Sequence, residues 1–91
     1  VRSTTNADGV ALLVLDRPPA NALDTAVVAD LALAFAAALA AGARAIVLSG
    51  RPGMFSGGLD VPALLPLPWA AIHAFWEQFF RLNRQLAESP V

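Results

Sequence analysis

The sequence predicts an α/β fold built from a strand, a helix and a second strand. An unbroken apolar run over residues 10–15 follows the turn pair Asp8-Gly9, which is typical of a strand buried on both faces. Apolar residues three or four positions apart then mark one stripe of a helix over residues 25–41. A short β-branched run over residues 44–48 predicts the next strand. Because a helix separates the two strands, we expect a right-handed crossover between parallel strands.

Turn and capping residues set the limits of these elements. Residues 1–8 are polar, and we expect a loose end or an edge strand there. Pro18 and Pro19 end the first strand, since proline cannot donate a ladder hydrogen bond. Asp24 is the expected N-cap of the helix, and Gly42 is its expected stop.

The last third of the chain predicts a connector and a second helix. Residues 61–68 carry three prolines and have room for no more than one turn of helix. A helical pattern returns over residues 69–88, where apolar and aromatic residues share one side, and Pro90 ends it. Val91 has the character of the first residue of another strand, so we expect the fold to continue beyond this chain.

Composition narrows the class of protein. Ninety-one residues make one small domain or part of a larger one, for which we expect marginal stability. The hydrophobic fraction is 57% and the charged fraction is 14%, against about 25% charged in ordinary soluble domains. We therefore expect apolar faces that are covered by the rest of a domain, by another subunit or by a membrane. The most apolar helical window, residues 25–41, contains Asp30 and is rich in alanine, so we predict no membrane span.

Charge and residue usage exclude several function classes. A net charge of −1 argues against nucleic-acid binding, because no basic face is available to displace counterions. The absence of cysteine excludes disulfides and thiolate metal sites, and it fits a cytoplasmic protein. All six basic residues are arginine, so the chain has no lysine for a Schiff base or a P-loop.

One glycine-rich segment has the composition of a binding loop. Residues 49–60, SGRPGMFSGGLD, follow the second predicted strand and contain four glycines. Glycine permits close approaches of the backbone, so that main-chain N–H groups can point into a pocket and stabilise an oxyanion. On glycine content alone, a surface connection between two elements is the simpler interpretation.

A second motif favours the binding interpretation. The segment RPPANAL, residues 17–23, follows the first strand, and IVLSGRPGMFSGGLD contains the next strand and its loop. With both motifs in this order, the chain resembles the enoyl-CoA hydratase/isomerase (crotonase) superfamily from about residue 9 to residue 91. The resemblance implies the N-terminal portion of a spiral of ββα units, truncated before the second half of its core. Residues 9–60 would form its βαβ part, with the coenzyme A and oxyanion loop.

The resemblance also implies roles for individual residues. The backbone N–H of Gly57 would be one of two donors that bind the thioester carbonyl oxygen as it becomes an enolate. The backbone around Ala20 and Ala22 would line the coenzyme A site. The other implied binding residues are Ser56, Gly58, Leu59 and Asp60. Independently of the resemblance, the Asp60 carboxylate suits a capping role in its own loop.

Several other residues have two interpretations. Arg17 could bind a phosphate group or simply be solvated. Phe55 is expected to anchor the loop in the core. His73, the single histidine, is expected to be a packed or surface residue, with Glu77 one turn away as a partner. Three aromatic residues could line an acyl pocket or simply pack in the core: Trp69, Phe75 and Trp76.

The resemblance implies enolate-stabilised chemistry on an acyl-CoA thioester, most commonly hydration of a 2-enoyl-CoA, a lyase reaction. Isomerase and acyl-CoA hydrolase activities are the alternatives within the family. The second donor and the acid/base glutamates would lie outside these residues, so a catalytically incomplete unit for binding or assembly is the second hypothesis. A membrane-associated amphipathic fragment is the third. We expect no permanently bound cofactor and no metal, and a homotrimer or hexamer for the complete protein.

Overall fold

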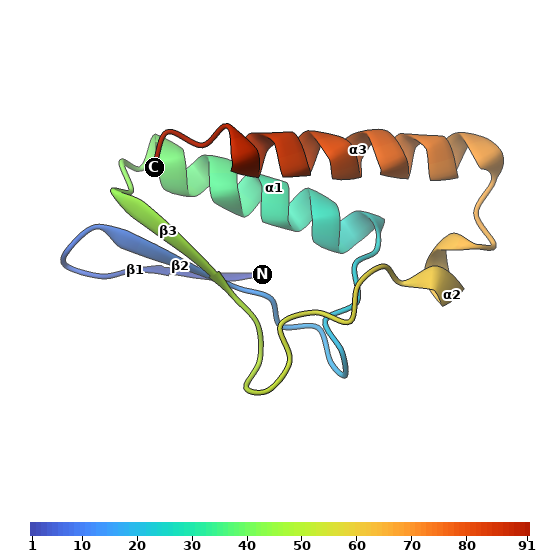
Figure 1. Ribbon diagram of the computed structural model, residues 1–91, viewed down its shortest axis with the longest axis horizontal. Helices are drawn as coiled ribbons and strands as arrows, with labels where there is room; N and C mark the ends of the chain where they lie inside the picture. The colour runs from blue at the N-terminus through green and yellow to red at the C-terminus, as the bar shows by residue number, and fades with distance from the viewer.

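The computed structural model describes residues 1–91, which form a three-stranded sheet with helices on one side (Figure 1). The strands β1 (Arg2–Thr5), β2 (Val10–Val14) and β3 (Ala45–Ser49) lie in the order β1-β2-β3. β1 is antiparallel to β2, and β2 is parallel to β3. The two long helices α1 (Thr25–Ala40) and α3 (Trp69–Ala87) run beside each other along the same side of the sheet.

The parallel pairing of β2 and β3 through α1 confirms the predicted strand–helix–strand unit. α1 begins where predicted, because the Asp24 side chain accepts the Val27 N–H at 2.9 Å. It ends where predicted as well, at Gly42, which has a φ of 85° that favours glycine. Of the two interpretations of residues 1–8, the edge strand is the one observed, as β1.

Only one face of the sheet is covered, so the prediction of a strand buried on both faces is wrong. Ala11 and Leu13 of β2 are fully buried on the helix side. Leu12 pairs in register with Val47 of β3, and both side chains are exposed. Successive side chains in a strand point to opposite faces. The second face of the sheet is therefore apolar and uncovered.

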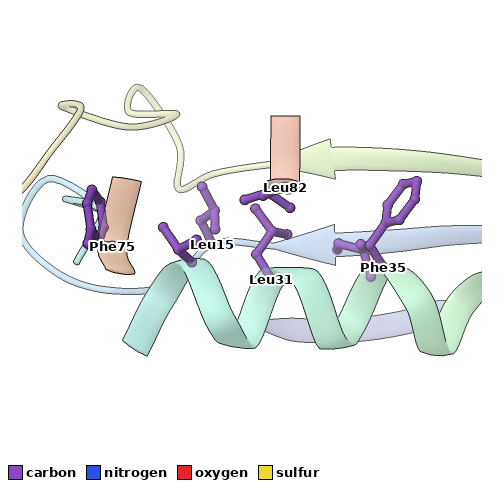
Figure 2. Close-up of a cluster of buried hydrophobic side chains, with 7 residues drawn as sticks. Leu15, Leu31, Phe35, Phe75 and Leu82 are labelled. Atoms are coloured by element: carbon purple, nitrogen blue, oxygen red, sulfur yellow. The ribbon is translucent and has the colours of Figure 1, made fainter. Parts of the chain in front are cut away.

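The core lies between the sheet and the two long helices (Figure 2). Leu15, just after β2, meets Leu31 and Phe35 of α1, while Phe75 and Leu82 reach the same cluster from α3. Phe75 and Leu82 are seven positions apart, about two helical turns, so they lie on one stripe of α3. Burial of each such side chain stabilises the fold by about 1.5–3 kcal/mol.

The rest of α3 confirms the predicted second helix but leaves most of its aromatic residues outside the core. Trp69 is exposed, and Trp76 stacks on the exposed Phe80 with 5.6 Å between ring centroids. Of the three aromatic residues with two interpretations, only Phe75 is a core residue. His73 Nε2 and Glu77 Oε1 are 3.1 Å apart on the exposed surface, as expected for a pair one turn apart.

Between β3 and α3 the chain forms a tight loop and one turn of helix, α2 (Val61–Leu64), as predicted for residues 61–68. Asp60 caps α2 by accepting the Ala63 N–H at 3.2 Å. Gly50 is the first glycine of the loop and lies where two backbone segments come very close to each other. A Cβ on Gly50 would lie 2.5 Å from the Cα and O atoms of Phe55, so no larger residue fits without moving the loop.

Phe75→Ala should destabilise the fold by about 3–5 kcal/mol, because it opens a cavity in the buried cluster to which α3 contributes Phe75. Phe80→Ala is the matched control: Phe80 lies on the same helix but is 64% exposed, so its loss should cost below about 1 kcal/mol. Urea unfolding followed by circular dichroism measures both. If Phe75→Ala is unfolded without urea, Phe75→Leu gives a smaller loss on the same scale. Equal effects of the two alanine variants would contradict the packing described.

Gly50→Ala should destabilise the chain by about 2 kcal/mol or more, because the new methyl group meets backbone rather than a flexible side chain. Gly57→Ala is the control, since a Cβ there would lie 3.3 Å from the Ala20 Cβ and needs only a small shift. Urea unfolding measures the free energy, and amide spectra of the loop report its displacement. An undisturbed loop in Gly50→Ala would contradict the close approach.

Candidate functional site

The two motif segments lie side by side and are joined by backbone hydrogen bonds. The Gly57 N–H donates to the Ala20 carbonyl at 2.7 Å, and the Leu23 N–H donates to the Gly58 carbonyl at 2.8 Å. The Asp60 N–H then donates to the Leu23 carbonyl at 2.9 Å. These bonds form a short parallel ladder, which brings the predicted site residues from both motifs into one place.

The hydrogen bonds of this loop occupy the N–H groups of both Gly57 and Gly58. The N–H of Gly57 is bonded to Ala20 and the N–H of Gly58 to the Ser56 hydroxyl at 3.1 Å. The prediction that Gly57 presents a free donor is therefore not met in this geometry. The physical reason is that the same N–H is needed to hold the loop against the other motif.

Leu59 has the outward-facing N–H in this loop. The Gly58 carbonyl points at Leu23, and in a planar trans peptide the carbonyl and the following N–H point in opposite directions. The Leu59 N–H must then point away from the ladder, and it donates to no acceptor in the chain. A backbone donor with these properties is able to bind a carbonyl oxygen or an oxyanion.

A groove of about 310 Å³ runs along the first motif and reaches this loop. Its lining residues are Arg17, Pro18, Pro19, Ala20, Ala22, Leu59, Asp60 and Pro62. Four predicted binding residues are thus brought together: Ala20, Ala22, Leu59 and Asp60. Ser56 and Gly58 do not line the groove; the Ser56 hydroxyl instead donates to the Asn21 carbonyl at 2.8 Å, and the Gly58 carbonyl belongs to the ladder.

Arg17, the one cationic side chain of the groove, is paired with two carboxylates. Arg17 Nη2 lies 3.2 Å from Asp24 Oδ2 and 2.9 Å from Asp60 Oδ2. Its Nη1 donates to the Ala22 carbonyl at 2.7 Å. Arg17 is therefore occupied by two carboxylates, which disfavours its use for a phosphate. For the same reason, neither carboxylate is free to act as a general base.

An apolar cavity of about 170 Å³ adjoins the groove. All seven lining residues are hydrophobic: Leu59, Val61, Leu64, Leu65, Ile72, Phe75 and Trp76. Phe75 and Trp76 thus line a pocket, as one of their two interpretations predicted, while Trp69 does not. Leu59 lines both the groove and the cavity, so this residue, which carries the unbonded N–H, is shared by the two spaces.

A further cavity, of about 350 Å³, is acidic. Asp16, Asp24 and Asp30 line it, with Arg17 as its single cationic side chain. An excess of carboxylates repels a ligand that carries phosphates. The groove beside Leu59 is therefore the better candidate for a phosphorylated ligand.

Asn21 was assigned no role from the sequence beyond its place in the motif RPPANAL. Asn21 is 1% exposed, has a φ of 50°, and donates from Nδ2 to the carbonyls of Met54 and Phe55 at 3.3 and 3.0 Å. Asparagine tolerates this left-handed conformation better than most residues, which was the available signal. The predicted anchor Phe55 is wrong in one respect: its ring is exposed, and only its backbone is held.

The chain contains no group of three or more histidine, cysteine or acidic side chains placed to hold a metal ion. None of its helices combines the length and the apolar character needed to cross a bilayer.

Comparison with known proteins identifies the family. The family model described as enoyl-CoA hydratase/isomerase matches residues 5–91. A glyoxysomal fatty acid beta-oxidation multifunctional protein, MFP-a, from Brassica napus is 43% identical over 56 residues, which cover 60% of this chain and 8% of that protein. The chain thus spans a small part of that relative.

A solved structure supports the same assignment. The crystal structure of an enoyl-CoA hydratase/isomerase family protein from Silicibacter pomeroyi superposes with a TM-score of 0.68 at 27% identity. The match covers 93% of this chain and 35% of that one, so the present chain spans about a third of the solved relative. Both motifs, the parallel strand–helix–strand unit and the site between them fall within the matched residues. The chain therefore belongs to the enoyl-CoA hydratase/isomerase family.

Proposed function

We propose that the site binds an acyl thioester of coenzyme A. The coenzyme arm would lie in the groove along Ala20 and Ala22, the acyl group in the apolar cavity, and the thioester oxygen at the Leu59 N–H. The observation that carries this proposal is Leu59, which has an unbonded N–H and lines both a groove and an apolar cavity. This assignment replaces Gly57 with Leu59 as donor, since the Gly57 N–H is bonded to Ala20.

The Leu59 N–H would stabilise negative charge on the thioester oxygen as an enolate forms. One such backbone donor is worth about 2.7–4 kcal/mol of transition-state stabilisation when it is preorganised. The ladder on the other side of the loop supplies that preorganisation, because three backbone bonds fix its orientation. Family membership and this donor support 2-enoyl-CoA hydration as the proposed reaction, with isomerisation and thioester hydrolysis sharing the same oxyanion.

The apolar cavity favours an uncharged hydrocarbon acyl group. No charged side chain lines it, so a carboxylated acyl group would be buried without a partner. A cavity of about 150 Å³ lined by aliphatic and aromatic side chains holds benzene, so this one suits an acyl chain of about six carbons.

The carboxylates that would move protons are not free in this site. Asp24 and Asp60 pair with Arg17, and Glu77 pairs with His73 on the exposed side of α3. Because the chain spans about a third of the solved relative, we place the acid/base groups and the second donor in sequence outside these residues. Assembly of the complete protein into trimers or hexamers stays a prediction that rests on the family resemblance.

A binding or assembly unit without turnover is the second candidate. The observation that favours it is the amount of uncovered apolar surface, on the open face of the sheet at Leu12 and Val47 and on α3 at Trp69 and Phe80. Such faces bury readily against other protein surfaces. This candidate shares the thioester site but not the catalysis.

Crotonyl-CoA should quench the fluorescence of the chain, because Trp76 lines the acyl cavity. A titration measures binding, and the absorbance of the conjugated thioester then measures hydration. Binding with turnover supports the hydratase, whereas binding without turnover is expected of both candidates, because both place the proton-transfer groups outside this chain. Trp76→Phe is the control, since it should bind with most of the quenching lost. No binding of crotonyl-CoA by the chain would contradict the proposed site.

Leu59→Pro should abolish polarisation of the bound thioester, because proline has no N–H to donate. Leu59→Ala is the matched control, as it shortens the side chain in the cavity but keeps the donor. The measurement is the ¹³C shift of carbonyl-labelled crotonyl-CoA on binding, which requires no turnover. In any protein that contains this chain and turns over, kcat should fall by about 10²–10³ for the proline variant. A carbonyl shift that survives in Leu59→Pro would exclude Leu59 as the donor.

A further inference from the structure

Every polar group of Asn21 is hydrogen-bonded, two of them within the first motif and two across to the second. Its Oδ1 accepts the Arg17 N–H at 2.7 Å, and its own N–H donates to the Arg17 carbonyl at 2.8 Å. Its Nδ2 donates across to the carbonyls of Met54 and Phe55, and its carbonyl accepts the Ser56 hydroxyl. The residue is 1% exposed, so each of these bonds replaces water that is excluded from the site.

These bonds lead directly to the proposed donor. The Ser56 hydroxyl that donates to Asn21 also accepts the Gly58 N–H, and the Gly58 carbonyl is bonded to Leu23. Both ends of Gly58 are therefore fixed, one of them through Asn21. The orientation of the peptide between Gly58 and Leu59 sets the direction of the Leu59 N–H.

We infer that Asn21 is a positioning residue for the Leu59 N–H, acting through the Met54–Ser56 backbone and the Ser56 hydroxyl. Its consequence for ligand binding rests on the proposed function, whereas its effect on the loop does not. The structure assigns the amide nitrogen a task that no carboxylate can perform. Nδ2 faces two carbonyl oxygens, and a carboxylate oxygen in its place would repel both.

This geometry predicts a pH-dependent variant. In Asn21→Asp, burial and the two facing carbonyls favour the neutral acid, which raises the pKa of the new carboxyl above its ordinary value. Below that pKa the acid can donate to a loop carbonyl, and above it the bond is lost as the pH rises. The charged groups around the position are Asp16, Arg17, Asp24, Asp30, Arg51 and Asp60. They are the same in the unmodified chain, which therefore provides the baseline at each pH.

The experiment follows the amide resonances of Gly57 and Gly58 in the ¹⁵N-labelled chain between pH 4.5 and 8. We expect native shifts for Asn21→Asp at low pH, and a displaced loop at high pH, with one ionisation. Asn83→Asp is the matched control, because the Asn83 Nδ2 also donates to a carbonyl, that of Phe79 at 2.9 Å, but on the exposed surface. Its loop resonances should follow those of the unmodified chain.

A loop in Asn21→Asp that keeps native shifts at every pH would overturn the inference. If Asn21→Asp is unfolded throughout, Asn21→Gly decides instead, because glycine keeps the φ of 50° and removes only the side chain. Displaced Gly57 and Gly58 resonances with unchanged core resonances would then support the inference, and unchanged loop resonances would overturn it.

Crotonyl-CoA binding separates this inference from the proposed function. For Asn21→Asp, the dissociation constant should rise about ten-fold or more between pH 5 and pH 8, while that of Asn83→Asp follows the unmodified chain. One outcome is that the loop of Asn21→Asp depends on pH while the unmodified chain binds no crotonyl-CoA. Asn21 would then still be a positioning residue, and the proposed ligand would be wrong. Another outcome is that the loop of Asn21→Asp depends on pH while its binding of crotonyl-CoA does not. Asn21 would then not position the Leu59 N–H, and the inference would be overturned.

Discussion

The buried amide of Asn21 is the interaction on which the rest of the site depends. The loop after β3 has few side chains to pack, and its one large aromatic residue, Phe55, is exposed. Its position is instead set by hydrogen bonds to the first motif, and Asn21 makes three of them. A buried polar group of this kind is costly when unpaired, so a fully bonded Asn21 specifies one arrangement of the loop.

That arrangement has a direct chemical consequence. The peptides of a strand present their N–H groups alternately to its two sides. Once the Gly58 carbonyl and the Asp60 N–H face Leu23, the N–H of Leu59 between them has to face the other way. The ladder that stabilises the loop is thus also what leaves one donor unbonded, on a residue that lines both a groove and an apolar cavity. Stability and the proposed chemistry depend on the same few peptide orientations.

The surroundings of this donor are paired charges on one side and apolar surface on the other. Arg17 holds both nearby carboxylates, so the groove has no free base, while the cavity beside it is wholly apolar. The sheet is covered on one face only, and α3 turns several aromatic side chains outward. The proposed thioester site therefore combines a groove, an apolar cavity and an unbonded donor, and the proton-transfer groups of the family reaction are proposed to come from elsewhere.

Much of the fold could be predicted from the sequence because its signals are local. The Asp24 cap, the Gly42 stop and the prolines of residues 61–68 act within a few residues, and each produced the expected boundary. The family followed from the order of two motifs, which is also a linear property. The prediction that both faces of β2 are buried was wrong, because only one face is covered. An apolar run in the sequence does not specify which elements pack on each face of the strand.

The sequence by itself determined the order of the elements, the family and the two segments that form the site. Only the tertiary structure decided which N–H of the loop stays unbonded, because Gly57 and Leu59 belong to the same glycine-rich segment and only the Gly57 N–H is bonded to the first motif. It also decided the partners of Arg17 and Asn21, which lie up to 43 positions away along the chain. Such contacts depend on the packing of distant segments, and local composition does not encode them.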